Sequence, residues 1–239
     1  MTCIILAAGY ATRLYPLTRD FPKPLLDVAG RSILDRIVDK ALRVPRLGHL
    51  VVVTNARFVS HFEEWRHSRF HAGSDAGPAG TPEPPGPAGP APRVSIVNDG
   101  STSNEDRLGA LFDLKLAVDR AGVDDDALVL AGDNLFDFEL SDFAAYFGHV
   151  KHDCITAHEL SDVAQLKRTG VVELAEDGRV MSFEEKPSEP QSSWAVPPFY
   201  AFLRHTLLTH LSAYLAQGGE ADAPGSFIPW LIRRVPVYA

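Results

Sequence analysis

The sequence predicts an α/β protein built on a doubly wound, mostly parallel sheet with a smaller antiparallel region. Short runs that are apolar at nearly every position alternate with helical periodicity along the first part of the chain, and two strand-like runs around a turn signal follow later. Strands covered by helices on both faces are apolar throughout, which is typical of parallel sheets. The 239 residues, 45% of them hydrophobic, suffice for one such Rossmann-like domain.

Five apolar runs are expected to form the parallel strands, and they are Cys3 to Ala8, Leu50 to Thr54, Val94 to Val97, Leu128 to Ala131 and Ile155 to His158. Between the first two runs, an amphipathic helix is predicted to begin at Ser32, with Asp35 three residues later completing a capping pattern. Ser141 is expected to cap another helix that continues through Phe147. A further helical stripe consists of Leu108, Leu111, Phe112 and Val118. Strand, helix, strand units of this kind predict the doubly wound sheet.

The second half changes character and predicts the antiparallel region. Gly170 to Leu174 and Val180 to Glu184 flank the turn signal Glu176-Asp177-Gly178-Arg179. A strand near Ala195 to Phe202 is expected next, followed by a helix that carries Leu207, Leu208, Leu211 and Leu215. We expect this region to lie on the substrate side, as a wall over the C-terminal edge of the parallel sheet.

Residues 73–92 form a Gly/Pro-rich segment in which 12 of 20 positions are Gly or Pro and none is a large apolar residue. Such a segment cannot bury enough surface to offset its ordering entropy, so it is predicted to be a disordered insertion. The alternating pattern continues on both sides, which favours an insertion in one domain, 1–239, over a linker between two.

Composition excludes several classes of partner and site. The chain has 31 acidic and 23 basic residues and a net charge of -8, which disfavours nucleic-acid and anionic-membrane binding. Its two cysteines, Cys3 and Cys154, are too few for a disulfide framework or a zinc site and are expected to be buried thiols. The sequence begins without a charged leader, and no apolar run approaches the ~18 residues that span a bilayer. These features predict a cytoplasmic protein.

The loop from Leu6 to Leu14 is a candidate phosphate-binding site. A strand that ends in small residues lets the backbone approach a ligand, and free N–H groups can hold phosphate oxygens. Arg13 and Lys23 would add positive charge over several phosphates. A small-residue turn after a first strand is also common without any ligand, but the prolines at 16, 22 and 24 fix the path to Lys23 and favour the functional interpretation.

Two later segments contain charged residues that are candidates for a functional site. Asp133 follows the apolar run Leu128 to Ala131, at the end of a strand where open α/β sheets bind ligands. It is either an ordinary turn or cap residue or an oxygen ligand for Mg²⁺ shared with nucleotide phosphates. The cluster Glu184-Glu185-Lys186 is, by itself, most often a solvated group of charges.

Four motifs in this order resemble those of the sugar-phosphate nucleotidyltransferases, the family that includes the glucose-1-phosphate thymidylyltransferases. They are the loop ending in Thr12-Arg13-Leu14 with Lys23-Pro24, then Ala131-Gly132-Asp133-Asn134, Gly170-Val171-Val172-Glu173 and Phe183-Glu184-Glu185-Lys186-Pro187. The resemblance implies a catalytic set of Arg13, Lys23, Asp133 and Lys186, with Asp133 as the metal ligand for Mg²⁺. It also implies nucleotide-binding residues, which are Leu6, Ala8, Gly9, Thr12, Arg13, Lys23, Asn104 and Gly109. The implied substrate-binding residues are Gly170, Glu185, Lys186 and Val196.

The reaction implied is transfer of a nucleoside monophosphate from a nucleoside triphosphate to a sugar 1-phosphate, releasing pyrophosphate. No nucleic-acid or membrane partner is expected, and a homo-oligomer is compatible with the sequence. The segment Asn98 to Gly109 lies where the family reads the base, and it is also similar to the Asn-containing segment of phosphocholine cytidylyltransferases. The base and the sugar therefore stay open.

Three alternatives accompany this hypothesis. One is a catalytically weak nucleotide or nucleotide-sugar binding module with a regulatory role, and another is a phosphocholine cytidylyltransferase-like enzyme. A nucleotide-sugar-dependent glycosyltransferase is disfavoured because Asp124-Asp125-Asp126 precedes a predicted strand instead of following one.

The chain departs from the family pattern at three places. Ala11 and Pro198 stand where the family usually has Gly, so we expect backbone strain at the first and a missing N–H donor at the second. Family members continue past Pro236-Val237-Tyr238 to a second metal-binding Asp, whereas this sequence stops at Ala239 and Asp222 is not a match for that residue. We expect either a truncated chain or one metal ligand fewer.

Overall fold

A computed structural model of the chain describes residues 1–70 and 91–239. The insertion predicted to be disordered, 73–92, lies outside these residues except for Ala91 and Pro92. Seven strands form the central sheet in the order β13-β7-β12-β6-β1-β4-β5. Their bounds are β1 (Thr2–Leu6), β4 (His49–Thr54), β5 (Arg93–Asn98), β6 (Ala127–Ala131), β7 (Asp153–Ile155), β12 (Phe199–Phe202) and β13 (Val237–Tyr238). Strand β12 runs antiparallel to both of its neighbours, and the other pairings are parallel.

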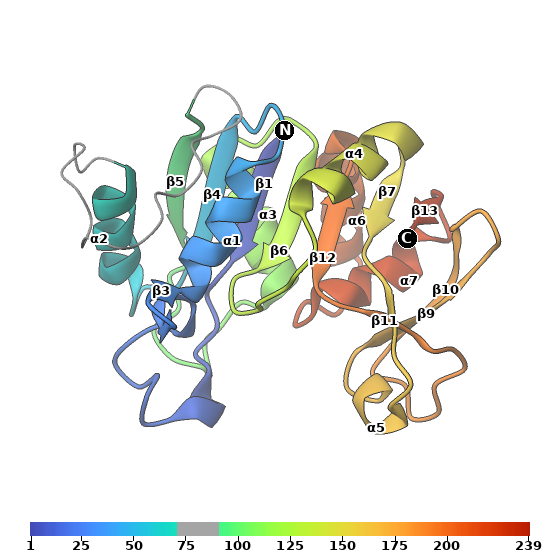
Figure 1. Cartoon of the computed structure of the whole chain (residues 1–239), viewed down its shortest axis with the longest axis horizontal. Coiled ribbons are helices and arrows are strands. Elements are labelled where there is room, and N and C mark those ends of the chain that lie inside the picture. Colours follow the sequence, from blue (N-terminus) through green and yellow to red (C-terminus); the bar gives the residue numbers. More distant parts are fainter. Residues whose placement is uncertain (71–90) are drawn as a thin grey trace.

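Helices cover both faces of this sheet, as predicted for a doubly wound fold. One face carries α1 (Ile33–Leu42) and α4 (Leu140–Val150), and the other carries α3 (Ala110–Ala121), α6 (Leu211–Ala216) and α7 (Ile228–Leu231), as Figure 1 shows. Helix α2 (Val59–Phe70) lies at the β5 edge (Figure 1). Adjacent residues of β1 enter different cores, with Ile5 packing on the α1 side and Ile4 on the α3 side. This two-sided burial explains why the parallel strands are apolar at nearly every position.

The antiparallel region is a four-stranded sheet in the order β10-β9-β11-β8. Its strands are β8 (His158–Glu159), β9 (Gly170–Leu174), β10 (Val180–Glu185) and β11 (Trp194–Val196), and a short helix, α5 (Val163–Leu166), lies between β8 and β9 in sequence. The predicted turn joins β9 to β10, with Gly178 at φ +83. This sheet lies at one end of the molecule, beside β7 and β12 (Figure 1).

Two predicted strands are each divided between the sheets. The run Ala195 to Phe202 was expected to be one strand, but β11 belongs to the small sheet and β12 to the large one. Pro197 and Pro198 separate them, because neither residue has an N–H to donate to a strand ladder. The run Ile155 to His158 is divided in the same way between the end of β7 and the start of β8.

Helix boundaries test the capping predictions. Ser32 caps α1 as predicted, accepting a 3.0 Å hydrogen bond from the Asp35 N–H. Ser141 was expected to cap α4, but that helix already begins at Leu140. The predicted stripe on α3 was partly wrong, because Leu108 and Phe112 are exposed. The buried face consists of Leu111, Leu114, Ala117, Val118 and Ala121, which the helical period places together.

The remaining elements are short. A two-stranded ribbon pairs β2 (Asp27–Val28) with β3 (Arg31–Ser32). Three 3-10 helices are η1 (Thr12–Leu14), η2 (Lys23–Leu25) and η4 (Pro224–Phe227), and a π-helical turn, η3 (Thr206–His210), precedes α6 within the helix predicted there. Cys3 and Cys154 are buried free thiols, as predicted, and burial raises the pKa of each to about 12. Among the described residues, every helix is too short or too polar to cross a bilayer.

Candidate functional site

The carboxyl ends of β1 and β6 lie side by side and define the position of the site. Leu6, the last residue of β1, is in register with Ala131, the last residue of β6. Strand β1 also pairs with β4 on its other side, and the chain runs from β1 to β4 and β5 before it crosses back to β6, so the strand order reverses beside β1. Open α/β sheets bind ligands at such a switch point. The predicted phosphate-binding loop and Asp133 follow directly from these two strand ends.

Close packing between the two strand ends requires a glycine before Asp133. The Gly132 N–H donates a 2.8 Å hydrogen bond to the Leu6 carbonyl. A Cβ atom at Gly132 would lie 3.0 Å from the Ala7 Cβ and from the Leu6 oxygen, so a side chain would force the strand ends apart. Asp133 is thereby held beside the loop that follows β1.

Lys23 and Asp133, both predicted to be catalytic, form an ion pair. The Lys23 Nζ lies 2.9 Å from Asp133 Oδ2, although the residues are 110 positions apart. Lys23 opens η2 between two prolines, which fix its backbone. The Lys23 side chain is 27% exposed and that of Asp133 46% exposed, so both reach the solvent from which a ligand would enter.

The loop before Lys23 holds Ala11 in a left-handed conformation, which was expected to be strained at this residue. Ala11 has φ +47 and ψ 41, a region that favours glycine. The buried Thr18 hydroxyl donates a 2.8 Å hydrogen bond to the Ala11 carbonyl and holds the loop in this shape. Thr12 and Arg13 are exposed on η1, and the Arg13 guanidinium makes no hydrogen bond or ion pair with any described residue. It is therefore available to an anion outside the protein.

A cavity of about 220 Å³ opens at the ends of β1 and β6 and the start of α3. Four residues predicted to bind nucleotide, Leu6, Ala8, Gly9 and Gly109, line it, together with Arg107, Ala110, Asp113, Ala131, Pro198, Asp222 and Pro224. Asn104 is outside this lining, but it accepts a 3.1 Å hydrogen bond from the guanidinium of Arg107. The structure thus brings four of the eight predicted nucleotide residues, from two chain segments, to one cavity, whereas Thr12, Arg13 and Lys23, like Asn104, lie outside its lining.

Gly109 is the residue before α3, and two constraints exclude a side chain there. Its φ is +94, and a Cβ atom would lie 2.9 Å from the carbonyl oxygen of Ala221. That same carbonyl accepts a hydrogen bond from the Leu111 N–H, which fixes the segment before η4 against the start of α3. The bare backbone of Gly109 therefore forms part of the cavity wall.

Sequence reasoning did not single out Asn55, which positions the phosphate-binding loop. It is fully buried after β4, and its Nδ2 donates a 2.9 Å hydrogen bond to the Ala8 carbonyl. Its Oδ1 accepts from the Phe58 N–H at 3.0 Å. A polar residue directly after a buried strand was the signal that could have found it, by the same reasoning that was applied to Asp133.

The four predicted substrate-binding residues lie together in the antiparallel sheet. Gly170 is in register with Glu185 on one side and with Val196 on the other. Lys186 follows at φ +50, and its Nζ lies 3.6 Å from the Glu185 carboxylate with 60% of the side chain exposed. Burial raises the pKa of Glu185, and the Lys186 ammonium opposes that shift. Within the described chain, no hydrogen bond or ion pair joins this group to the Lys23–Asp133 pair.

Pro198 separates two cavities. It lines the cavity above and also a second one of about 480 Å³, where the other walls are Asn134 to Phe138, Thr156 to His158, Thr169, Pro197 and Phe199. The Pro198 carbonyl accepts a 3.2 Å hydrogen bond from the Ala131 N–H, which fixes its position between them.

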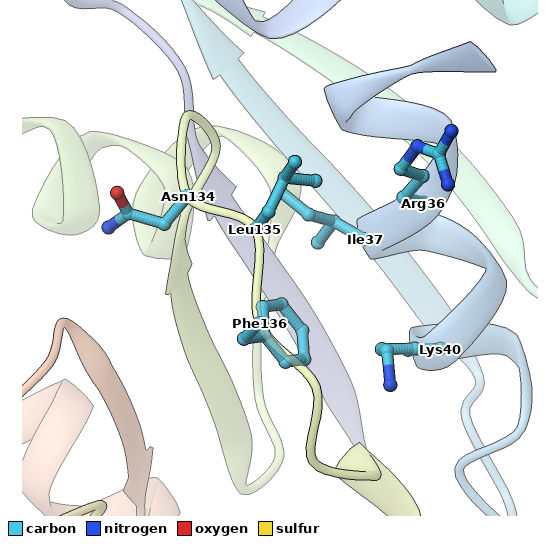
Figure 2. A pocket seen from close by; sticks show the side chains of 6 residues that line it. All are labelled: Arg36, Ile37, Lys40, Asn134, Leu135 and Phe136. Carbon is cyan, nitrogen blue, oxygen red and sulfur yellow. The ribbon is translucent and has the colours of Figure 1, made fainter. Parts of the chain in front are cut away.

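A third cavity, of about 220 Å³, lies between α1 and the chain that follows Asp133. Figure 2 shows Leu135 and Phe136 on the side of that chain facing Ile37 and Lys40 of α1, while Asn134 projects away from the helix. None of the residues predicted to be functional lines this cavity. It shares Asn134, Leu135 and Phe136 with the second cavity, so the two adjoin.

The donor set at Asp133 fits Mg²⁺ only as a site shared with a ligand. No cluster of three His, Cys, Asp or Glu side chains that could hold a metal occurs among residues 1–70 and 91–239. Asp133 supplies a single carboxylate, and Mg²⁺ is commonly held by one or two carboxylates together with substrate phosphates. The Asp222 carboxylate, which lines the cavity at the ends of β1 and β6, pairs with the Arg107 guanidinium at 2.8 Å.

Comparison with known proteins identifies the family. The family model described as nucleotidyl transferase matches residues 2–235. A bifunctional protein GlmU of Methanococcus maripaludis is 28% identical over 192 residues, which is 80% of this chain but 37% of that protein. The UTP–glucose-1-phosphate uridylyltransferase AglF of Haloferax volcanii is 27% identical over 205 residues, covering 84% of this chain and 72% of AglF. The chain thus spans well under half of the GlmU protein's length.

Solved structures share the fold at lower identity. A Bacillus anthracis protein assigned as a glucose-1-phosphate thymidylyltransferase aligns with a TM-score of 0.75 and 21% identity over 100% of this chain and 85% of that one. A UDP-glucose pyrophosphorylase complexed with UDP-glucose aligns with a TM-score of 0.72 and 16% identity over 99% and 89% of the two chains. These likenesses establish the Rossmann-like nucleotidyltransferase architecture.

Proposed function

The chain belongs to the nucleotidyl transferase family, and on that premise we propose that it transfers a nucleoside monophosphate from a nucleoside triphosphate to a sugar 1-phosphate. The products are a nucleoside diphosphate sugar and pyrophosphate. The observation that carries the proposal is the contact between Lys23 and Asp133 beside the cavity at the ends of β1 and β6. The contact supports the proposal because it brings together a cation and a carboxylate that could bind phosphates and a metal ion.

In this reaction an oxygen of the acceptor phosphate attacks the α-phosphorus, and the bond to the bridging oxygen of the β-phosphate breaks. The attacking phosphate is already an anion, so no general base is required. The obstacle is repulsion, because two unit charges about 4 Å apart at an effective dielectric near 20 interact by about 4 kcal/mol. Catalysis therefore consists of positioning and of preorganised positive charge.

The residues of the chain divide this task. Arg13 and Lys23 bind the triphosphate, and the backbone from Leu6 to Gly9 and at Gly109 approaches the nucleotide closely. Asp133 would hold Mg²⁺ together with the phosphates, and the bound ion would supply further charge neutralisation. Lys186 binds the acceptor phosphate, while Gly170, Glu185 and Val196 bind the rest of the acceptor. The proximity of Glu185 to Lys186 supports this assignment.

One observation favours a second acceptor class, a phosphorylated amine such as phosphocholine. The cavity beyond Pro198 has aromatic walls in which the ring of Phe136 lies 4.7 Å from Phe138 and 4.6 Å from Phe199 between centroids. Asp137 adds a carboxylate to the same lining, which includes no Lys or Arg, although Lys40 Nζ lies 5.4 Å from the centroid of the Phe136 ring. Aromatic faces with a nearby carboxylate suit quaternary ammonium groups. The phosphoryl chemistry would be unchanged.

The test is pyrophosphate release from each of the common nucleoside triphosphates, mixed in turn with sugar 1-phosphates and phosphocholine in the presence of Mg²⁺. Release with a sugar 1-phosphate supports the first proposal, and release with phosphocholine alone supports the second. Thermal stabilisation by nucleotides without any turnover would instead identify a binding module. Chelation of the divalent ion is expected to stop release if Asp133 binds Mg²⁺ as proposed.

A further inference from the structure

Asn55 is a fully buried polar residue that none of the proposed catalytic steps uses. It directly follows β4, and both ends of its side-chain amide make hydrogen bonds. Its Oδ1 accepts from the Phe58 N–H at 3.0 Å, and its Nδ2 donates to the Ala8 carbonyl at 2.9 Å. Turning the amide over would set a donor against the Phe58 N–H and an acceptor against the Ala8 carbonyl, so these two partners permit only one orientation.

The bond from Asn55 fixes the direction of the peptide between Ala8 and Gly9. This peptide is planar and trans, so its carbonyl and its N–H point in opposite directions. The carbonyl points toward Asn55, on the side of β1 where β4 lies. The Gly9 N–H therefore points toward the other side of β1, where β6 lies.

The cavity at the ends of β1 and β6 lies on that second side. Its walls include Ala131, the last residue of β6, and Pro198, which precedes β12. Gly9 is exposed and belongs to the same lining. Within the part of the chain that the structure describes, the Gly9 N–H makes no hydrogen bond. It is therefore a backbone donor whose direction toward the cavity depends on Asn55.

A glycine at this position allows the peptide to turn. Glycine adopts either sign of φ, and even a Cβ at Gly9 would meet nothing within 4 Å, so rotation of the peptide meets little steric resistance. A rotated peptide would point the Ala8 carbonyl oxygen, instead of the Gly9 N–H, toward the cavity. That oxygen would repel the phosphate oxygens that an N–H binds. The bond to Asn55 opposes the rotation, because a buried amide that loses its partner is unfavourable.

The rest of the loop is held independently of Asn55. The Tyr10 hydroxyl lies 3.1 Å from that of Ser101, and only 3% of Tyr10 is exposed. The Thr18 hydroxyl holds the Ala11 carbonyl at 2.8 Å. Loss of the Asn55 donor is therefore expected to release one peptide and to leave the path of the loop unchanged.

We propose that Asn55 is a positioning residue for the triphosphate, which holds the peptide between Ala8 and Gly9 so that the Gly9 N–H donates to a phosphate oxygen. This inference rests on the proposed function, because it assigns the cavity at the ends of β1 and β6 to the nucleotide. A donor that already points at the anion does not have to reorient when the anion binds. Asn55 thus acts on the affinity for nucleotide through the backbone, without touching the ligand.

The experiment measures equilibrium binding of CTP, ATP, GTP, UTP and dTTP, each with Mg²⁺, to the full chain, and the tightest binder is then used with two variants. Asn55→Ala removes the donor and should raise the Kd of the triphosphate by about fivefold or more at pH 7.5. Asn55→Asp tests the direction of the bond, because a carboxylic acid can donate to the Ala8 carbonyl and a carboxylate cannot. Relative to the unmodified chain at the same pH, its Kd should be within about threefold at pH 5.5 and about tenfold or more higher at pH 9.

Thr206→Val is the matched control. It removes another buried side-chain hydrogen bond, which the Thr206 hydroxyl donates to Asp153 at 2.7 Å, and neither residue lines any of the three cavities. This variant should lose thermal stability but keep the Kd within about twofold. A Kd of Asn55→Ala within twofold of the unmodified chain overturns the inference. So does an equal rise in Thr206→Val, or a loss in Asn55→Asp that is the same at both pH values.

Hydrogen exchange of the unmodified chain provides a second measurement, which decides the question if the Asn55 variants do not fold. Followed by NMR, the Gly9 N–H should exchange rapidly in the free chain and about tenfold or more slowly with a saturating triphosphate. A Gly9 N–H that is already protected in the free chain, or that the nucleotide leaves unprotected, refutes the inference. Failure of the unmodified chain to bind any triphosphate contradicts the proposed function itself and is distinct from these outcomes.

Discussion

Replacing Lys23 by Met tests the assignment of the ion pair at the strand ends. One cation about 4 Å from a phosphate charge contributes about 4 kcal/mol at an effective dielectric near 20. Because the Lys23 side chain is 27% exposed, solvent screening reduces that contribution to about 2 to 3 kcal/mol. The variant is therefore expected to lose a factor of about 30 to 150 in kcat/KM. The assay is initial-rate pyrophosphate release with the most active pair of substrates.

The same substitution should leave the fold nearly unchanged. A partly exposed ion pair such as that between Lys23 and Asp133 contributes at most about 1 kcal/mol to the free energy of unfolding. A chain of this size would then lose no more than about 4 °C in Tm. Lys115→Met is the matched control, because it removes another lysine paired with an aspartate, Asp119, at 2.5 Å. Activity of Lys23→Met within threefold of the unmodified chain, or an equal loss in Lys115→Met, would refute the assigned role.

Three further predictions concern stability. Gly170→Ala places a Cβ 2.5 Å from the Phe183 ring and should lower the free energy of unfolding by about 1 to 3 kcal/mol. Gly48→Ala is the control, because a Cβ there meets nothing within 4 Å. Equal melting temperatures of the two variants would contradict the prediction. Burial raises the folded-state pKa of Asp153 from 3.8 to about 6, so the folded chain keeps a proton that the unfolded chain has lost, and stability falls as pH rises through that window. The free energy of unfolding of Asp153→Asn, relative to that of the unmodified chain, should therefore rise by up to about 3 kcal/mol between pH 4 and pH 7, as measured by denaturant unfolding. A difference that does not depend on pH would contradict this prediction. Ala11→Gly should relieve the left-handed strain at φ +47 and raise stability by about 0.5 to 1 kcal/mol in the same assay, a result that any loss of stability would disprove.

Local patterns were sufficient for the elements whose boundaries depend on neighbouring residues. The Ser32 cap was predicted because the hydroxyl and the Asp35 N–H are three residues apart, and they form the bond expected of that spacing. The resemblance to the family, which usually has Gly at the position of Ala11, indicated that a positive φ would be strained there, and Ala11 has a φ of +47. Ser141 failed as a cap because the residue in the cap position is Glu139, two residues earlier, and local signals leave helix ends uncertain by one or two residues.

Patterns were insufficient where the partner of a segment decided its structure. The run Ala195 to Phe202 is apolar enough for one strand, yet its halves pair with β9 and with β6 in different sheets. Leu108 and Phe112 look like core residues, but the packing of α3 leaves both exposed. The pairing of a strand and the orientation of a helix depend on distant segments, which hydrophobic periodicity does not report.

The sequence by itself determined the type of sheet, the edge at which we propose that ligands bind and the chemical nature of the groups at that edge, since buried strands and the polar residues that follow them are local features. Tertiary structure decided which of those groups meet. Lys23 reaches Asp133, 110 positions later in the chain, only because β1 and β6 pair in parallel, and Asp113 is buried beside Asp99 because α3 packs against β5. Long-range pairing and burial set these contacts, and no segment of the chain specifies them alone.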